Sequence, residues 1–381
     1  MIGSIKHALL ALAAVSLLAA CGGKENVREP ARLQDIASPA LKPDKAWSES
    51  TGGGKFHSSL RVALEADALF TANQDGEVYA LNPQTGKQLW RAKTGARVIS
   101  GPSVSGDLVF VGTLDAEVIA LKRADGAEAW RGKLGSEVMA PVASDGQIVI
   151  ARAVDGRLYG LSASDGSRLW VFDRSVPNLT LRGLSEPLIV GNRAFVGMDN
   201  GRVVAFSTST GQILWEQAVA VPSGRTELDR ITDIDAALLA EGANICAASF
   251  GGELACFDAD NGEVQWRRSI KSYSGMVLLG QLLVVSDEAG IVWALDAHSG
   301  AAAWKQEGLQ YRKLSPPAAF GGYAVVADFE GYLHWMDPKD GKLVARTRAG
   351  SDPVHAPMAA DENFLYVLNT SGKISAISAK P

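Results

Sequence analysis

One segment recurs along the chain, and it constrains the fold more than any other feature of the sequence. Residues 75–90 contain an Asp-Gly turn, a short apolar stretch, a second turn with a glycine, and a tryptophan. Copies lie at residues 115–130, 155–170, 200–215, 251–266 and 289–304, and weaker copies begin at residues 330 and 371. A period of about forty residues with short strands and tight turns is typical of propeller blades, whereas helical repeats show an apolar period of about 3.6 residues.

The second copy indicates how one blade is built. We predict strands at residues 99–104, 108–112 and 117–121, followed by a fourth strand that contains Trp130. Asp-Gly, Asn-Gly and Ser-Gly pairs in the turns tolerate positive φ and favour tight hairpins. The third strand is apolar on both faces, as expected of a strand that lies between two neighbouring blades. The repeats therefore predict four-stranded antiparallel blades.

A tryptophan four residues after the second glycine ends each full copy, as Trp90 does after Gly86. Burial of an indole ring removes about 150–250 Å² from water, a gross gain of roughly 4–6 kcal/mol. We therefore expect the tryptophans to pack blade against blade. Two positions depart from the repeat, since Ala116 replaces a turn glycine and Ala345 replaces the tryptophan. Both departures bear on blade packing.

The two ends of the repeat region complement each other. Trp47 occupies a repeat position but has no earlier strands of its own, and residues 354–378 supply three strands without a fourth. We therefore predict that residues 44–50 form the outer strand of the last blade. The result is an all-β fold, an eight-bladed β-propeller of four-stranded antiparallel blades that occupies residues 44–381 as one domain.

The N-terminus has the features of a lipoprotein signal peptide. Lys6 and His7 precede an apolar run at residues 8–20, which has the length of a secretory signal and is too short to cross a bilayer. The sequence Leu-Ala-Ala-Cys that ends at Cys21 is typical of a bacterial lipobox, in which the cysteine is lipidated and becomes the mature N-terminus. An ordinary signal peptide with an incidental Cys21 is the alternative.

The segment between the lipobox and the repeats predicts the location of the protein. Gly22, rather than aspartate, follows the cysteine, which indicates the periplasmic face of the outer membrane of a Gram-negative bacterium. Residues 21–43 are polar and contain three prolines, so we expect a flexible, lipidated tether. The acyl chains would then be the membrane anchor.

No constellation of catalytic or metal-ligating residues is recognisable in the sequence. The formal charge is −5 and no basic block is present, which argues against nucleic acid as a partner. The five histidines have no metal-ligand spacing. The sequence also lacks G-x-S-x-G, Walker A and G-x-G-x-x-G motifs. We therefore predict no catalytic residue, no metal and no cofactor.

Cys246 and Cys256 lie symmetrically about Gly251, at the centre of a predicted hairpin turn. The two side chains should therefore face each other across the hairpin. In an oxidising periplasm this favours a disulfide with a structural role, and two buried thiols are the alternative.

Two connections between blades are longer than the others. The interval from Trp170 to Trp215 exceeds forty residues by five, and the interval from Trp215 to Trp266 exceeds it by eleven. The additional residues fall at 171–187 and 216–237. Consecutive connections of this kind emerge side by side on one face of a propeller, and long loops on a rigid scaffold often carry binding sites.

These two loops carry the residues that we predict to bind a partner. The first contains Leu179, Leu181 and Arg182, and the second contains Asp233 and Asp235. Apolar anchors beside an arginine and carboxylates suit a protein interface. The alternative is that Arg182 pairs with Asp233 or Asp235 and merely fixes the loops.

The chain resembles the BamB family, the propeller lipoproteins of the outer-membrane β-barrel assembly (BAM) machinery. The resemblance covers the lipobox, the tether and eight repeats of the pyrroloquinoline-quinone (PQQ) enzyme type. It is most specific at residues 179–187 (Leu-Thr-Leu-Arg-Gly-Leu-Ser-Glu-Pro) and 229–235 (Asp-Arg-Ile-Thr-Asp-Ile-Asp). In that family the two loops contact the periplasmic POTRA domains of BamA. The resemblance therefore implies that Leu179, Leu181, Arg182, Asp233 and Asp235 form the contact with BamA.

The function implied by this resemblance is scaffolding without catalysis, in which the protein assists the folding and insertion of β-barrel proteins. Nascent barrel proteins would be a further partner. A PQQ-dependent dehydrogenase is the first alternative, because its repeats are similar. Enzymes of that family are longer chains with adjacent cysteines, calcium ligands and a catalytic aspartate. In this sequence Cys246 and Cys256 are not adjacent. A periplasmic propeller that binds another envelope protein or a polysaccharide is the second alternative.

Overall fold

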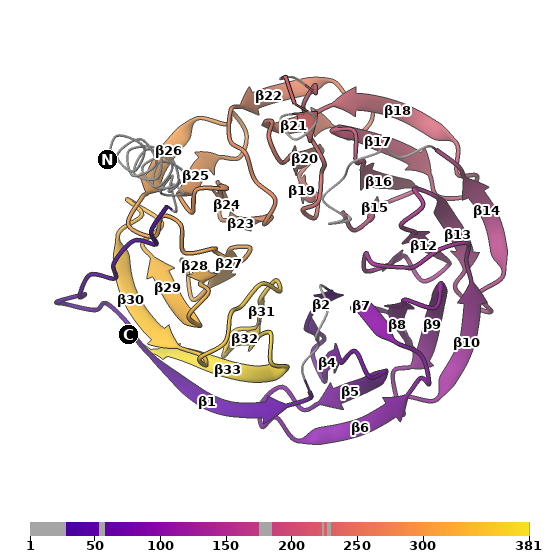
Figure 1. Cartoon of the computed structure of the whole chain (residues 1–381), viewed down its shortest axis with the longest axis horizontal. Helices are drawn as coiled ribbons and strands as arrows, with labels where there is room; N and C mark the ends of the chain where they lie inside the picture. The colour runs from indigo at the N-terminus through magenta and orange to yellow at the C-terminus, as the bar shows by residue number, and fades with distance from the viewer. Residues whose placement is uncertain (1–27, 53–57, 175–184, 223–224, 227–229, 381) are drawn as a thin grey trace, which may run out of the picture.

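Eight sheets are arranged around a central axis in the computed structural model, and each sheet is one blade (Figure 1). The structure describes residues 28–52, 58–174, 185–222, 225–226 and 230–380. Each blade has four antiparallel strands, which follow one another in order from the central axis to the rim. The predicted eight-bladed all-β propeller is confirmed.

The first four blades contain strands β3 to β18. Blade 1 consists of β3 (Ala63–Leu64), β4 (Leu69–Ala72), β5 (Glu77–Leu81) and β6 (Gln88–Lys93), and blade 2 of β7 (Val98–Ser105), β8 (Leu108–Thr113), β9 (Glu117–Lys122) and β10 (Glu128–Lys133). Blade 3 consists of β11 (Ala143–Ser144), β12 (Ile148–Arg152), β13 (Leu158–Ser162) and β14 (Arg168–Phe172), and blade 4 of β15 (Leu188–Val190), β16 (Arg193–Gly197), β17 (Arg202–Ser207) and β18 (Ile213–Ala218). A short strand, β2 (Ser59–Leu60), pairs in parallel with β7 and adds a fifth strand to blade 2.

The remaining blades follow the same plan. Blade 5 consists of β19 (Leu239–Glu241), β20 (Asn244–Ala248), β21 (Leu254–Asp258) and β22 (Val264–Arg268), and blade 6 of β23 (Met276–Leu279), β24 (Leu282–Ser286), β25 (Val292–Asp296) and β26 (Ala302–Gln306). Blade 7 consists of β27 (Ala318–Phe320), β28 (Tyr323–Ala327), β29 (Tyr332–Met336) and β30 (Leu343–Arg348), and blade 8 of β31 (Ala359–Ala360), β32 (Leu365–Leu368), β33 (Lys373–Lys380) and β1 (Lys42–Ser50).

Blade 8 closes the ring with both ends of the propeller. Strand β1 pairs antiparallel with β33, from Lys42 opposite Lys380 to Ser50 opposite Lys373. Figure 1 shows β1, in indigo, along the outer side of the yellow β33. The strand begins at Lys42, two residues before the predicted start. The N-terminal strand therefore completes the last blade, as the unpaired tryptophan at position 47 predicts.

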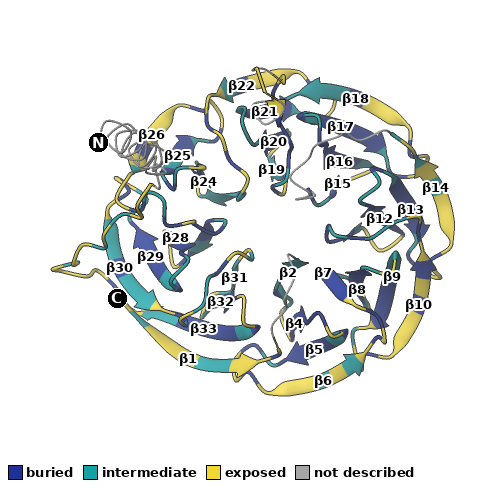
Figure 2. Ribbon diagram, viewed as in Figure 1, coloured by how far each residue is buried: buried dark blue, intermediate teal, exposed yellow. Residues whose placement is uncertain are grey.

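The core lies between the blades. Val118 and Leu121, which point to opposite faces of the third strand of blade 2, are both buried. Figure 2 shows the same pattern around the ring, with buried middle strands and more exposed strands at the rim. A third strand that is apolar on both faces is therefore covered on both sides by neighbouring blades.

The repeat tryptophans join each blade to the next. The Trp130 indole lies against Gly166, where an added Cβ would be 2.4 Å from the ring, and its Nε1 donates to the Ala163 carbonyl at 2.8 Å. Gly166 has a φ of +71°, so the position excludes a side chain both sterically and conformationally. The same tryptophan–glycine contact joins Trp47 to Gly86, Trp90 to Gly126, Trp130 to Gly166, Trp170 to Gly211, Trp215 to Gly262, Trp266 to Gly300 and Trp304 to Gly341.

Blade 7 is the exception, and the closure of the ring explains it. Its tryptophan position holds Ala345, and the facing blade 8 has no turn between its third and fourth strands, because β33 and β1 are opposite ends of the propeller. An indole there would have no turn glycine to pack against. The volume is instead supplied by Trp335, which pairs with Ala345 from the neighbouring strand and is fully buried. In blade 1 the roles are reversed, and Ala80 lies opposite Trp90.

Part of the predicted flexible tether is held against the propeller. The amide of Ala31 donates to the Gln310 carbonyl at 2.9 Å, and Arg312 donates back to the Ala31 carbonyl at 3.0 Å. Leu41 is buried in the core of blades 7 and 8. Residues 28–41 of the predicted tether therefore contact the propeller through backbone hydrogen bonds and apolar burial.

The membrane-targeting features lie outside the described residues, namely the signal peptide at residues 1–20 and the lipidation site Cys21. Within the described ranges, no helix has the length and apolarity needed to cross a bilayer.

The structure joins Cys246 and Cys256 by a disulfide. The two residues are register partners on β20 and β21, and both are fully buried between blades 5 and 6. The bond thus links neighbouring strands of one hairpin, which is a structural position.

Removal of one tryptophan–glycine contact should weaken the whole ring. We expect Trp130→Ala to lower the free energy of unfolding by about 3–5 kcal/mol, because it leaves a cavity between blades 2 and 3. Urea denaturation measures this change. Leu89→Ala is the control, since Leu89 is 53% exposed on an outer strand and a substitution there should change stability by less than about 0.5 kcal/mol. Equal midpoints for the two variants would contradict this account of the contact.

Loss of the disulfide should have a smaller effect. We expect the Cys246→Ala/Cys256→Ala variant to lose about 2–3 kcal/mol of stability, because the bond closes a short loop in the unfolded chain. Thiol titration of the denatured protein should detect neither of these cysteines before reduction and both after it. Two reactive thiols without reductant would show that the bond does not form.

Candidate protein interface on blades 3 to 5

The two lengthened connections lie on one face of the propeller. The first joins β14 to β15 through residues 173–187, and the second joins β18 to β19 through residues 219–238. Connections between blades emerge on the same side as the turns between second and third strands, because the strands alternate in direction. We call this side the loop face. Leu179, Leu181 and Arg182 lie outside the described residues. Of the predicted contact residues, the structure describes Asp233 and Asp235.

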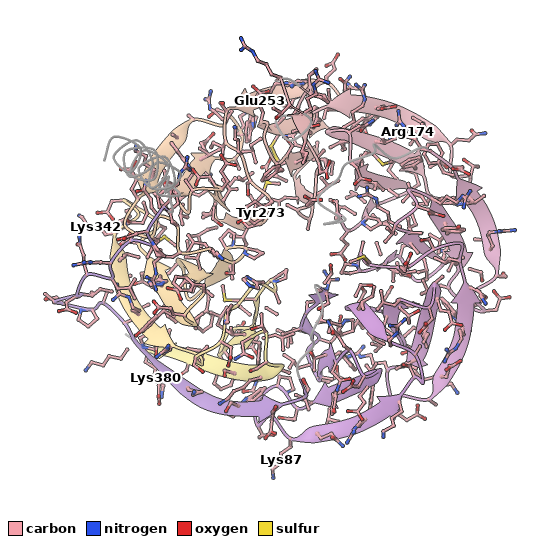
Figure 3. All side chains as sticks on the ribbon, viewed as in Figure 1. Lys87, Arg174, Glu253, Tyr273, Lys342 and Lys380 are labelled. Carbon is pink, nitrogen blue, oxygen red and sulfur yellow. A yellow bond between two sulfur atoms is a disulfide. The ribbon has the colours of Figure 1, made fainter. Side chains whose placement is uncertain are left out.

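The first connection is fastened at its beginning to the rim of blade 4. The Arg174 side chain, labelled in Figure 3, lies near the outer strands, and its Nη2 is 2.9 Å from Glu216 Oε1 on β18. Arg202 on β17 pairs with the same carboxylate at 2.5 Å. The two arginines therefore share one partly buried acceptor, which ties the loop to two strands of the blade.

The ends of the two connections are packed together. Ser185 Oγ donates to the Ala236 carbonyl at 2.9 Å, and both Ser185 and Ile234 are fully buried. Gly197 makes room for this packing, since an added Cβ would lie 2.3 Å from Ile234 Cγ2. The two loops therefore share one rigid base on blade 4.

The two predicted aspartates differ in exposure. Asp233 is 1% exposed, and its carbonyl accepts a hydrogen bond from the Phe250 amide at 2.9 Å. Asp235 is partly exposed. Phe250 also contacts Tyr273, whose ring is 6.2 Å away and which Figure 3 places toward the central axis. Asp235 is therefore the more accessible of the two predicted contact residues, whereas Asp233 belongs to the buried base of the loop.

A buried ion pair beneath these aspartates escaped sequence reasoning. Arg152 lies at the end of β12 and donates to Asp199 at 2.5 Å and to the Gly197 carbonyl at 2.7 Å, with both charged side chains almost fully buried. The sequence does carry a signal, because the equivalent strand ends in blades 1 and 5 hold Ala72 and Ala248. An arginine at the end of the otherwise apolar strand β12 indicates a buried partner of opposite charge.

The charges of this region act on Asp235. Burial, together with the negative charges of Asp233 and Asp199, raises the pKa of the Asp235 carboxyl to about 8, although the positive charge of Arg152 partly opposes this shift. The carboxyl therefore carries a proton at neutral pH in the isolated protein. A cationic group of a partner would favour ionisation, so such a contact should release a proton.

Within the described ranges, no group of three or more His, Cys, Asp or Glu side chains is arranged to hold a metal ion.

The fold is a propeller of PQQ-type repeats, and its loop face carries a candidate protein interface. Comparisons with known proteins agree with the fold. The family model described as outer membrane protein assembly factor BamB matches residues 44–306. The outer membrane protein assembly factor BamB of Alkalilimnicola ehrlichii is 50% identical over 374 residues, which cover 98% of this chain and 97% of that protein. The chain therefore belongs to the BamB family.

Solved structures show the same architecture. The crystal structure of BamB from Moraxella catarrhalis matches with a TM-score of 0.80 and 26% identity, over 88% of this chain and all of that one. A quinohemoprotein alcohol dehydrogenase from Pseudomonas putida matches with a TM-score of 0.71 and 13% identity, over 91% of this chain and 77% of that one. The second likeness concerns the fold alone.

The raised pKa of Asp235 should make stability depend on pH. Because the folded-state pKa of about 8 exceeds the unfolded value of about 3.9, the folded state binds this proton more tightly, and stability falls as pH rises between these values. Asp235→Asn removes this contribution. We therefore expect the variant to gain stability relative to the wild type as pH rises from about 5 to about 8.

Chemical denaturation at several pH values measures the difference. Asp75→Asn is the control, because Asp75 is exposed in a turn on the loop face of blade 1. A constant difference between Asp235→Asn and the wild type across this range would show that Asp235 is ionised throughout.

Proposed function

We propose that this protein is a non-catalytic scaffold of the BAM complex, which binds the periplasmic POTRA domains of BamA and assists the folding and insertion of β-barrel proteins. The observation that carries the proposal is the shared base of the two lengthened loops on blade 4, where Ser185 bonds to the Ala236 carbonyl. Its relatives are named outer membrane protein assembly factors. A rigid propeller that presents two adjoining long loops suits a scaffold.

The proposed contact combines both loops. Leu179 and Leu181 supply apolar anchors, and Arg182 supplies hydrogen-bond donors. Asp235 supplies a carboxyl from the second loop. Asp233 supports the interface from below, because its side chain is buried and its negative charge raises the pKa of Asp235.

The membrane attachment is part of the proposal. A lipid on Cys21 would hold the protein at the periplasmic face of the outer membrane, as the lipobox predicts. The segment 28–41 then connects the anchor to blade 8 along the surface of blades 6 and 7.

Unfolded barrel proteins are a further proposed partner. Strands at the rim expose an unpaired edge, to which an extended segment can add a strand. Leu169 and Leu214 on β14 and β18 are 55% and 48% exposed, so these rims also offer apolar contacts.

The enzyme alternative has a direct test. A quinone-dependent dehydrogenase would reduce a dye when PQQ, calcium and an alcohol are added, and a scaffold would not. If the protein instead serves to bind a polysaccharide or another envelope protein, it should show no affinity for BamA.

The interface makes a quantitative prediction. We expect Arg182→Ala and Asp235→Ala each to weaken binding to the purified periplasmic part of BamA by about 10-fold to 100-fold, a loss of roughly 1.4–3 kcal/mol. Calorimetric titration measures the affinity, and thermal unfolding checks the fold. Asp235 is a better probe than Asp233, because truncation of a buried side chain also disturbs the loop base.

Arg97→Ala is the matched control for this experiment. Arg97 is an exposed residue in the connection between blades 1 and 2, which emerges on the same loop face. It should bind BamA as the wild type does. Full binding by both Arg182→Ala and Asp235→Ala, or a loss that merely follows unfolding, would refute the site.

A further inference from the structure

We infer that Arg61, which is attached to blade 2, is a positioning residue for the proposed interface. It holds the end of the first long loop through an ion pair with Glu186, next to blade 4. This inference rests on the proposed function. It adds a residue that neither the repeat pattern nor the loop sequences single out.

The contact between the two residues is bidentate. Arg61 Nη2 donates to Glu186 Oε1 at 2.7 Å, and Nη1 donates to Oε2. The guanidinium also donates from Nε to the Pro102 carbonyl at 3.2 Å and from Nη2 to Ser103 Oγ at 3.1 Å. All three nitrogens of the guanidinium are therefore engaged, which fixes its plane as well as its position.

Arg61 itself is attached to a rigid part of the propeller. Its amide donates to the Gly101 carbonyl at 2.9 Å, and the preceding β2 pairs in parallel with β7, Ser59 opposite Ser100 and Leu60 opposite Gly101. The donor side of the ion pair is thus part of the inner edge of blade 2. Figure 1 shows β2 and β7 on the inner side of the ring.

Glu186 belongs to another blade. It directly follows Ser185 in the shared loop base and precedes β15 by two residues. The ion pair therefore connects blade 2 to blade 4 past the inner end of blade 3, between residues 125 positions apart in the chain. Each side chain is 21% exposed, so the pair is screened by solvent and salt less than a fully exposed ion pair would be.

This arrangement fixes the first loop at both ends. Arg174 and Glu216 hold its beginning at the rim, and Arg61 and Glu186 hold its end near the axis. A loop whose ends are fixed loses less conformational freedom on binding, which improves affinity without any new contact to the partner. Arg61 would therefore contribute to binding although it does not belong to the loop.

The test is a double-mutant cycle on the mature protein. Arg61→Gln and Glu186→Gln should each weaken binding to the periplasmic part of BamA by about 3-fold to 10-fold, with little change in the melting temperature. The double variant should bind no more weakly than either single variant, because both substitutions break the same contact. Arg61→Lys keeps the charge but not the bidentate geometry, so it should fall between the wild type and Arg61→Gln.

Arg193→Gln is the matched control. Arg193 pairs with Asp260 at 3.0 Å between the neighbouring blades 4 and 5 on the side opposite the loop face. It should bind as the wild type does, which separates loop positioning from a general effect of lost ion pairs.

Two results would overturn the inference. Wild-type affinity of Arg61→Gln together with lost binding in Arg182→Ala would leave the proposed function intact and remove Arg61 from it. Additive losses in the double variant would show that Arg61 does not act through Glu186. Wild-type affinity of Arg182→Ala and Asp235→Ala would instead refute the proposed function itself. If Arg61→Gln is unstable, Glu186→Gln and Arg61→Lys give the same comparison.

Discussion

The tryptophan–glycine contact between neighbouring blades is the interaction on which the rest of the structure depends. Each indole packs against a turn glycine of the next blade and donates to a carbonyl of the same turn, as Trp130 does at Gly166 and Ala163. The glycine is needed for two reasons, because its φ is positive and because a Cβ would enter the ring. One contact thus sets the distance, the orientation and the order of adjacent blades.

The place where this contact is missing shows how the ring closes. Blade 8 combines β33 with β1 and therefore has no turn against which an indole could pack. In the facing blade 7, the fourth strand carries Ala345 where other blades have a tryptophan, and the third strand carries Trp335 opposite it. The ring is instead closed by a long antiparallel pairing between the two ends of the propeller. A frame closed in this way can carry two long loops whose shared base, around Ser185 and Ile234, is as buried as the core.

Charge gives the loop base its chemical character. Arg152 and Asp199 form a buried pair below Asp235, and burial together with neighbouring carboxylates raises the pKa of Asp235 to about 8. A partner that supplies a cation would find a carboxyl ready to ionise. The interface we propose therefore combines a loop base that is already packed with a carboxyl whose ionisation responds to the charge of the partner. Both properties arise from contacts between different blades.

The sequence by itself determined the blade, the number of blades and the closure, because turns, apolar alternation and the tryptophan spacing are local patterns that repeat. It also located the two long loops, since an interval between tryptophans is read along the chain. Only the tertiary structure decided that Asp233 is buried, that Arg152 meets Asp199, that Arg61 meets Glu186 and that residues 28–41 lie against the propeller. These facts depend on which residues the closed ring brings together from distant parts of the chain, and a local pattern contains no record of such neighbours.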